Sequence, residues 1–202
     1  EGYRVAIVPQ PNWRDDLRDF TKLGAPRLFF GVSAGAMDSM VNHYTANIRL
    51  RSNDAYTAGG KAGFRPDHAA TVYTQILKRL YPHVPVVVGG IEASLRRLTH
   101  YDYWSDSLKP SMIVESGADL LIYGMGERVV QQVAKAMRNG YNAKLLRKIN
   151  QVAFLADKSY VERLDPATTK ILHSYEECCR DKHAFAENFV EEETLSNVME
   201  PT

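Results

Sequence analysis

The sequence predicts an α/β fold: a doubly wound, mostly parallel sheet followed by a helical C-terminal extension. Short apolar runs of four to six residues alternate with segments of helical period. Such continuous apolar runs are typical of parallel strands that are covered on both faces. The alternation stops near residue 156, where the local charge also changes sign. Strands and helices that alternate in this way are usually joined by right-handed βαβ crossovers.

Five apolar runs are the predicted strands, and the last has the weakest pattern. They are residues 3–8, 28–32, 84–88, 119–123 and 151–156.

Amphipathic segments lie between the strands. The fullest apolar stripe covers residues 69–80, with Pro66 just before it. Residues 37–44 and 130–137 repeat the spacing, and Gly140 is suited to end the second of these helices. Residues 47–65 have no period and contain several glycines and basic residues, which predicts a long basic loop of the kind that is often functional.

The composition indicates a globular protein, and the distribution of charge divides the chain into two parts. Hydrophobic residues make up 45% and charged residues 24%, which is typical of a globular protein and excludes a disordered one. Residues 1–156 hold 20 of the 25 basic and 13 of the 24 acidic residues, a net charge of +7, whereas residues 157–202 carry −6. We therefore predict an α/β domain over residues 1–156 and an acidic helical extension over residues 157–202.

The extension contains both cysteines. Ser174 and Glu177 form a capping-box pattern at a helix start, and Cys178 and Cys179 fall on the apolar face of that helix. Two adjacent cysteines cannot form a disulfide framework or a zinc site by themselves, so we expect buried thiols and a cytoplasmic protein. There is no apolar run of about 18 residues, and residues 1–4 lack a signal-peptide pattern, so we expect no membrane association.

The loops that follow the predicted strands form the first candidate site. In an open α/β sheet these loops gather at one edge, where ligands bind. Glycines in them could serve only to turn the chain, but several together favour a crevice. The candidate ligand-edge residues are Ser33, Gly35, Asp38, Gly89, Gly90, Glu92, Gly124, Gly126 and Glu127.

A dense polar and aromatic segment continues from this edge. Arginines and aromatic rings together suit a base, phosphate or carboxylate ligand, but they equally suit a connector packed on the sheet, with Asp102 or Asp106 paired to an arginine. His100 could perform acid–base chemistry with Asp102 and Glu92, or could simply be hydrogen-bonded. The further candidate residues are Arg96, Arg97, His100, Tyr101, Asp102, Tyr103, Trp104 and Asp106.

Standard nucleotide motifs are not found in the sequence. Gly124-Met125-Gly126 begins a G-x-G, but Val129 stands where the third glycine or alanine belongs, and there is no G-x-x-x-x-G-K-[ST]. No catalytic or metal-binding set is therefore predicted in this chain.

Several blocks resemble known families. Residues 84–90 and 118–127 are similar to the cobalamin-binding-like (flavodoxin-like) Rossmann domain that precedes many radical-SAM catalytic domains. Residues 10–13, 28–40, 42–46 and 54–57 more narrowly resemble the YgiQ family of radical-SAM iron–sulfur proteins. Residues 89–106, 174–177 and 181–186 extend this resemblance over nearly the whole chain.

The resemblance implies an N-terminal accessory or substrate-binding domain. A radical-SAM domain of the same polypeptide would follow and would cleave S-adenosylmethionine on a [4Fe–4S] cluster. This chain lacks the C-x-x-x-C-x-x-C that holds such a cluster, and also the D-x-H-x-x-G loop that binds cobalamin. We therefore expect no cofactor on this chain, and the substrate is unknown.

The resemblance also implies a missing first strand and helix. In such domains residues 3–8 would be the second strand, and the first strand lies centrally between the second and the third. A gap there would leave backbone groups unpaired, so we expect residues upstream of Glu1.

Two further functions remain open. The net charge of +7 would permit an RNA-binding module formed by the basic loop and the arginine–aromatic segment. A cobalamin or nucleotide carrier is the other alternative.

Overall fold

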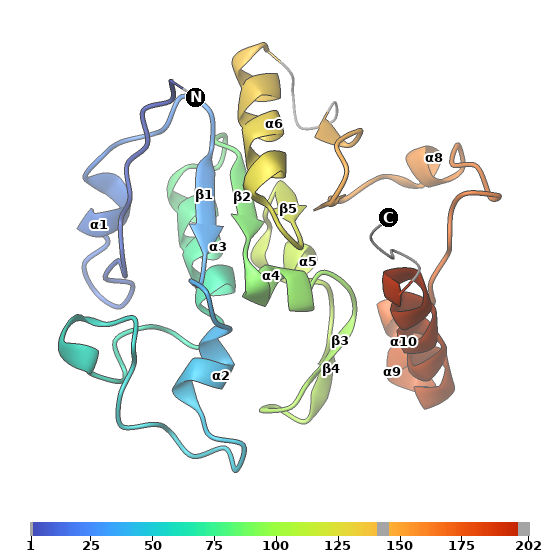
Figure 1. Ribbon diagram of the computed structural model, residues 1–202, viewed down its shortest axis with the longest axis horizontal. Coiled ribbons are helices and arrows are strands. Elements are labelled where there is room, and N and C mark those ends of the chain that lie inside the picture. The colour runs from blue at the N-terminus through green and yellow to red at the C-terminus, as the bar shows by residue number, and fades with distance from the viewer. Residues whose placement is uncertain (1, 141–145, 198–202) are drawn as a thin grey trace. The chain divides into compact units, whose positions relative to one another are not determined.

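The computed structural model describes residues 2–140 and 146–197 and divides into two compact units (Figure 1). The first unit comprises Glu1–Arg97 and Met112–Leu155, and it contains the sheet. The second comprises Leu98–Ser111 and Ala156–Thr202, which form a hairpin and helices. Residues 198–202 of the predicted extension lie outside the described residues.

The first unit contains a four-stranded sheet in the order β1-β2-β5-β6. Strands β1 (Phe30–Ser33), β2 (Val86–Gly89) and β5 (Leu120–Ile122) are parallel, and β6 (Val152–Ala153) pairs antiparallel with β5. In the register, Gly31 lies opposite Val87. The sheet confirms the predicted mostly parallel α/β fold.

Helices connect and cover these strands (Figure 1). They are α1 (Arg18–Thr21), α2 (Ser39–His43), the 3-10 turn η1 (Ala58–Gly60), α3 (Ala69–Leu80), α4 (Ile91–Leu95), α5 (Met112–Ser116) and α6 (Glu127–Arg138).

Two apolar cores lie on opposite faces of the sheet. Val86 and Val88 pack with the predicted stripe of α3 and with α5, whereas Val87 packs with Val129 and Val133 of α6. Neighbouring residues of a strand point to opposite faces, so the continuous apolar run of β2 supplies both cores. The first candidate site therefore stands on a sheet that has an apolar core on each face.

The predicted strand at residues 3–8 is wrong for this structure. These residues belong to no strand, and Val5 and Ile7 are 79% and 83% exposed. A strand needs a neighbour to accept its backbone hydrogen bonds, and within the described residues no partner pairs with this segment. Its apolar pattern therefore does not form a strand here.

Helix α2 begins later than its apolar spacing predicts. The side chain of Asp38 accepts hydrogen bonds from the N–H groups of Met40 and Val41, so the helix starts at Ser39. Met37 and Val41 are exposed, and Met40 is the buried apolar residue of this turn.

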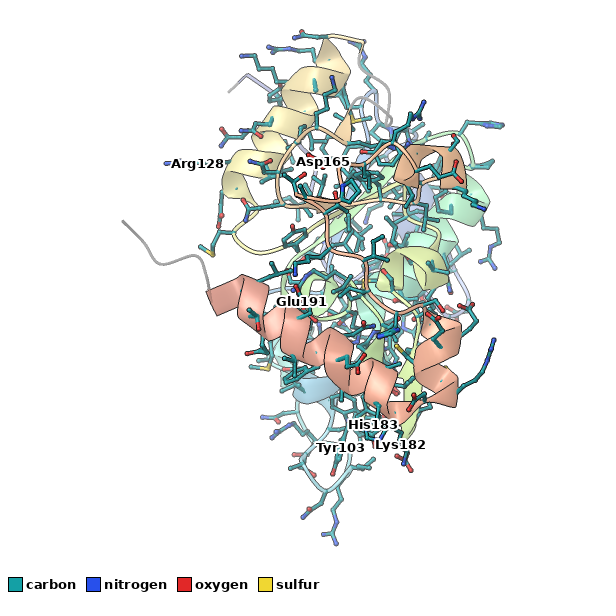
Figure 2. All side chains as sticks on the ribbon, turned by 90° about the vertical axis from the view of Figure 1, so that its right-hand side faces the viewer. Tyr103, Arg128, Asp165, Lys182, His183 and Glu191 are labelled. Carbon is teal, nitrogen blue, oxygen red and sulfur yellow. The ribbon has the colours of Figure 1, made fainter. Side chains whose placement is uncertain are left out.

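The second unit combines a hairpin with C-terminal helices. Strands β3 (His100–Asp102) and β4 (Ser107–Lys109) pair antiparallel, and the helices are α8 (Lys158–Val161), α9 (Tyr175–Arg180) and α10 (Lys182–Asn197). Tyr175 of α9 donates its hydroxyl to the carbonyl of Leu108 (3.3 Å). Figure 2 labels Lys182 and His183 at the start of α10 and Glu191 further along it. No described helix has the length and apolar character needed to cross a bilayer.

The predicted C-terminal helix is divided in two. Ser174 and Glu177 form the predicted capping box, but Asp181 adopts an extended conformation and ends α9. Cys178 is buried and Cys179 is exposed, so burial of both thiols was a wrong expectation. Adjacent helical residues point about 100° apart, and a short helix packed on one side buries only one of them.

Candidate functional site

Three loops meet at the carboxyl edge of the sheet, as the sequence predicts for its ligand edge. Ser33 Oγ, at the last residue of β1, accepts a hydrogen bond from the N–H of Gly35 (3.2 Å). Ser94 Oγ donates to the carbonyl of Gly90 (2.9 Å) and accepts from the N–H of Gly124 (3.0 Å). These bonds join the loop after β2 to the loop after β5, which sets the spacing of the edge.

Gly90 allows the loops after β1 and β2 to approach closely. Its φ of 85° and ψ of −175° lie in a region that essentially only glycine adopts. A Cβ at this position would lie 2.6 Å from Ser33 Oγ. The glycine pattern at this edge therefore reflects a steric requirement, and not only a turn.

A shallow apolar groove extends from this edge over β1 and β2. Its cavity volume is about 230 Å³, and it contains the predicted residues Ser33, Gly89, Gly90 and Gly126. The remaining lining residues are mostly apolar, among them Phe29, Val87 and Ile122. A surface of backbone, small and apolar side chains suits binding by shape, because it offers no group for acid–base chemistry.

Two of the charged edge candidates, Asp38 and Glu92, are buried beneath the loops. Glu92 is fully buried, and its two carboxylate oxygens accept hydrogen bonds from the N–H groups of Ser39 and Ala70, each at 2.9 Å. Asp38 caps α2 and forms a buried ion pair with Arg96. These residues join α2, α3 and α4, so their geometry supports positioning of the edge.

Arg97 and Glu127 remain nearer to solvent. The guanidinium of Arg97 donates to the carbonyl of Ser94 (2.7 Å) and stacks 5.3 Å from the ring centre of Tyr123. Glu127 is exposed in the first turn of α6. Both side chains are charged groups near the rim.

The rest of the arginine–aromatic segment belongs to the second unit. His100 Nδ1 lies 3.1 Å from the carbonyl of Leu98, and Asp102 accepts hydrogen bonds from Ser105. The hydroxyl of Tyr101 donates to Asp106 at 2.5 Å, which raises the pKa of Tyr101. Tyr103, which is labelled in Figure 2, stacks edge-on against Trp104 (5.9 Å). The segment is thus divided between two units after Arg97.

Sequence reasoning missed a polar cluster in the first unit, which we call the His43 cluster: His43, Tyr44, Asp54, Arg65 and Asp67. Asp67 accepts hydrogen bonds from Tyr44 (2.8 Å) and lies 2.9 Å from His43 Nδ1. His43 Nε2 lies 3.6 Å from Asp54, which pairs with the buried Arg65 at 2.7 Å. The cluster lines a cavity of about 230 Å³.

The carboxyl group of Asp54 anchors this cluster. Burial by itself would raise its pKa, but hydrogen bonds from Arg65, the N–H of Tyr56 and Asn42 outweigh burial, so the pKa lies below its usual value. Asp54 is therefore a charged carboxylate at neutral pH, and it accepts hydrogen bonds from its neighbours in the cluster.

The His43 cluster connects to the edge loops. Arg65 also donates to the carbonyl of Ala34 (3.0 Å), beside Ser33, and the ring of Tyr56 packs against Gly35. His43 and Asp67 are 24 residues apart, so the local polar pattern at residues 42–45 gave no signal of their pairing. The cluster thus offers a row of polar groups from the exposed Asp67 to the buried Arg65, in which His43 Nδ1 contacts Asp67 and His43 Nε2 lies 3.6 Å from Asp54, beyond hydrogen-bond distance.

No described group of three or more histidine, cysteine or acidic side chains could hold a metal ion. The hypothesis of an RNA-binding module needs basic side chains that can contact phosphate. Arg65 and Arg96 are instead buried in ion pairs.

Comparisons with known proteins find relatives that share one description. A "UPF0313 protein" of Porphyromonas gingivalis is 60% identical over 197 residues, covering 98% of this chain and 31% of that protein. Similar proteins from Bacteroides thetaiotaomicron and Thermotoga maritima are 55% and 46% identical and cover 96% and 92% of this chain. The chain spans about a third of the length of these relatives. No solved structure matches it.

A family model described as "Radical SAM N-terminal" matches residues 1–201. The comparisons support neither an RNA partner nor a cobalamin or nucleotide carrier. The match covers nearly the whole sequence, as do the relatives above, and the chain therefore belongs to the Radical SAM N-terminal family.

Proposed function

We propose that this accessory domain covers the catalytic domain of a longer radical-SAM protein through the carboxyl edge of its sheet, and that it contributes there to substrate binding. The edge consists of the loops around Ser33, Gly90 and Gly126, with the groove behind them.

The observation that carries this proposal is an exposed apolar rim around the edge. Met37, Ile91 and Leu95 are exposed in the segments after β1 and β2, and Met125, after β5, is 77% exposed. Large apolar side chains gathered beside a groove are typical of an interaction surface. About two thirds of each relative's length lies outside the matched part, so these relatives are long enough to contain a further domain.

The radical chemistry itself would reside outside this chain. A [4Fe–4S] cluster needs suitably spaced cysteine thiolates, and this chain has only Cys178 and Cys179. The residues described here do not fit that group. We propose that the cluster and S-adenosylmethionine bind to the remainder of the polypeptide. The two free thiols favour a cytoplasmic location.

The proposal is tested in the full-length protein with Met125→Glu. A carboxylate buried without a partner at a domain interface is costly, so the edge should open more often. We expect hydrogen exchange in peptides covering residues 33–38 and 89–95 to become about tenfold faster, which corresponds to about 1.4 kcal/mol.

Val114→Glu is the matched control. Val114 is 55% exposed on α5, which is not one of the loops that form the edge, and it should accept the same substitution without a change in exchange at these peptides. Equal exchange in wild type and Met125→Glu would contradict the proposal.

A further inference from the structure

The cavity beside the His43 cluster is a second candidate site, and it shares no lining residue with the groove at the sheet edge. Its volume of about 230 Å³ is below the range of about 300–1,000 Å³ that is typical of sites for drug-sized ligands. Leu50 and Ala62 supply apolar lining, whereas Arg14 and Asp67 are charged lining residues that are exposed to solvent. The cavity therefore suits a small molecule that has both apolar and charged groups.

Asp67 supplies this cavity with a carboxylate in a fixed position. His43, whose side chain is only 6% exposed, lies with Nδ1 2.9 Å from one carboxylate oxygen, and the hydroxyl of Tyr44 donates to the other at 2.8 Å. A carboxylate has about four lone-pair sites, so these two contacts leave room for a further donor. The side chain of Asp67 is 47% exposed, so a ligand can reach it. An ammonium group is a strong donor to such an anion.

Arg14 supplies the opposite charge. Its guanidinium lies 5.3 Å from the ring centre of Trp13 and donates to the carbonyl of Gly63 at 2.5 Å. The indole N–H of Trp13 donates to the carbonyl of Phe64 (2.8 Å), so both side chains are held against the loop that lines the cavity. A guanidinium has five N–H donors, and a single bond to a carbonyl leaves others for a carboxylate. In the part of the chain that the structure describes, Arg14 and Asp67 do not pair with one another.

We propose that this cavity binds a free α-amino acid with an aliphatic side chain. Its ammonium group would bind to Asp67 and its carboxylate to Arg14, and its side chain would contact Leu50 and the other apolar lining. Because two opposite charges line one small cavity without pairing, a zwitterion satisfies both at once. A simple amine would meet the like charge of Arg14, and a simple carboxylic acid would meet that of Asp67, so neither fits as well.

The inference goes beyond the proposed role of the edge. The two sites have no lining residue in common, so either proposal can fail while the other holds.

Equilibrium dialysis of the full-length protein with labelled L-leucine tests the inference, with L-valine as a second probe. Two analogues of leucine are matched competitors: 3-methylbutylamine lacks only the carboxylate, and 4-methylpentanoate lacks only the ammonium group. We expect L-leucine to bind at least about tenfold more tightly than either analogue, because each analogue leaves one charged group of the protein without its partner. Equal affinity for leucine and an analogue, or no binding of leucine or valine, would overturn the proposal.

Variants of the two charged lining residues locate the binding. Arg14→Gln and Asp67→Asn should each weaken the binding of L-leucine at least about tenfold. The matched controls are Arg18→Gln and Asp16→Asn, which remove the same charges from a surface ion pair outside the cavity lining and should bind as wild type does.

Thermal unfolding shows whether each variant is folded. Arg14 is exposed, so Arg14→Gln decides the question even if Asp67→Asn is unstable. Unchanged leucine binding in folded Arg14→Gln would exclude this cavity as the site.

Discussion

Gly90 is the residue on which the close contact of the edge loops depends. Its backbone conformation is almost confined to glycine, and Ser33 Oγ occupies the space that a Cβ would need. Gly59 offers a useful contrast: its φ is also positive, but a Cβ added there would meet no atom within 4 Å. The same residue type thus meets two different requirements in one chain.

We expect Gly90→Ala to lower the free energy of unfolding by about 3 kcal/mol, because backbone strain and the contact with Ser33 add. Gly59→Ala should cost about 1 kcal/mol, from its left-handed backbone alone. Urea unfolding measures both. Adding Ser33→Ala to Gly90→Ala should recover part of the loss, and no recovery would show that the contact is unimportant.

At the scale of elements, a buried ion pair between two of its own residues stabilises the long loop of residues 47–65. The sequence predicts this loop and its basic character, but Arg65 is paired with Asp54 and bonded to Ala34. The ion pair therefore fixes the loop against the turn after β1. Removing one member of a buried pair is costly because the other charge loses its partner.

We expect Asp54→Asn to lower the free energy of unfolding by about 3 kcal/mol at pH 7. The pKa of Asp54 is lowered in the folded protein, so its charge stabilises the fold above the usual value of 3.8. This contribution is lost as the pH falls through 3.8 toward the folded-state pKa, so wild type and variant should converge in acid.

Asp16→Asn is the matched control for this experiment, because Asp16 pairs with Arg18 on the surface. It should leave the unfolding midpoint at pH 7 unchanged. A difference between wild type and Asp54→Asn that stays constant from pH 7 to pH 3 would contradict the assigned role of the carboxylate.

At the scale of the whole molecule, the chain passes between its two units three times, after Arg97, Ser111 and Leu155. The hairpin of β3 and β4 belongs with the C-terminal helices, although it is surrounded in sequence by the first unit. Residues 156–173 contain the short helix α8 and are mostly exposed, with Ile171 among the most exposed apolar residues.

Limited trypsin digestion of the full-length protein should therefore cut early at Lys158, Arg163 or Lys170. Exposed segments with few backbone hydrogen bonds open most easily. Lys78, which lies on α3 and pairs with Asp119, should be cut late. Mass spectrometry of the products measures the order, and early cleavage at Lys78 or Arg65 would contradict this view of the fold.

By itself, the sequence determined the local features: strands β1, β2, β5 and β6, the helices α3 and α6, the long loop, the capping box of α9 and the glycine-rich edge. These features depend on periodicity and on backbone preferences within a few residues. Its block-by-block resemblance also pointed to the family that the comparisons show.

Only the tertiary structure decided which distant groups meet. Glu92 bonds to the N–H of Ala70, Asp54 to Arg65, and His43 to Asp67, and none of these partners follows from spacing along the chain. Residues 3–8 have the pattern of a strand and yet form none, because a strand exists only when another strand accepts its backbone hydrogen bonds. Burial and pairing are properties of the assembled fold.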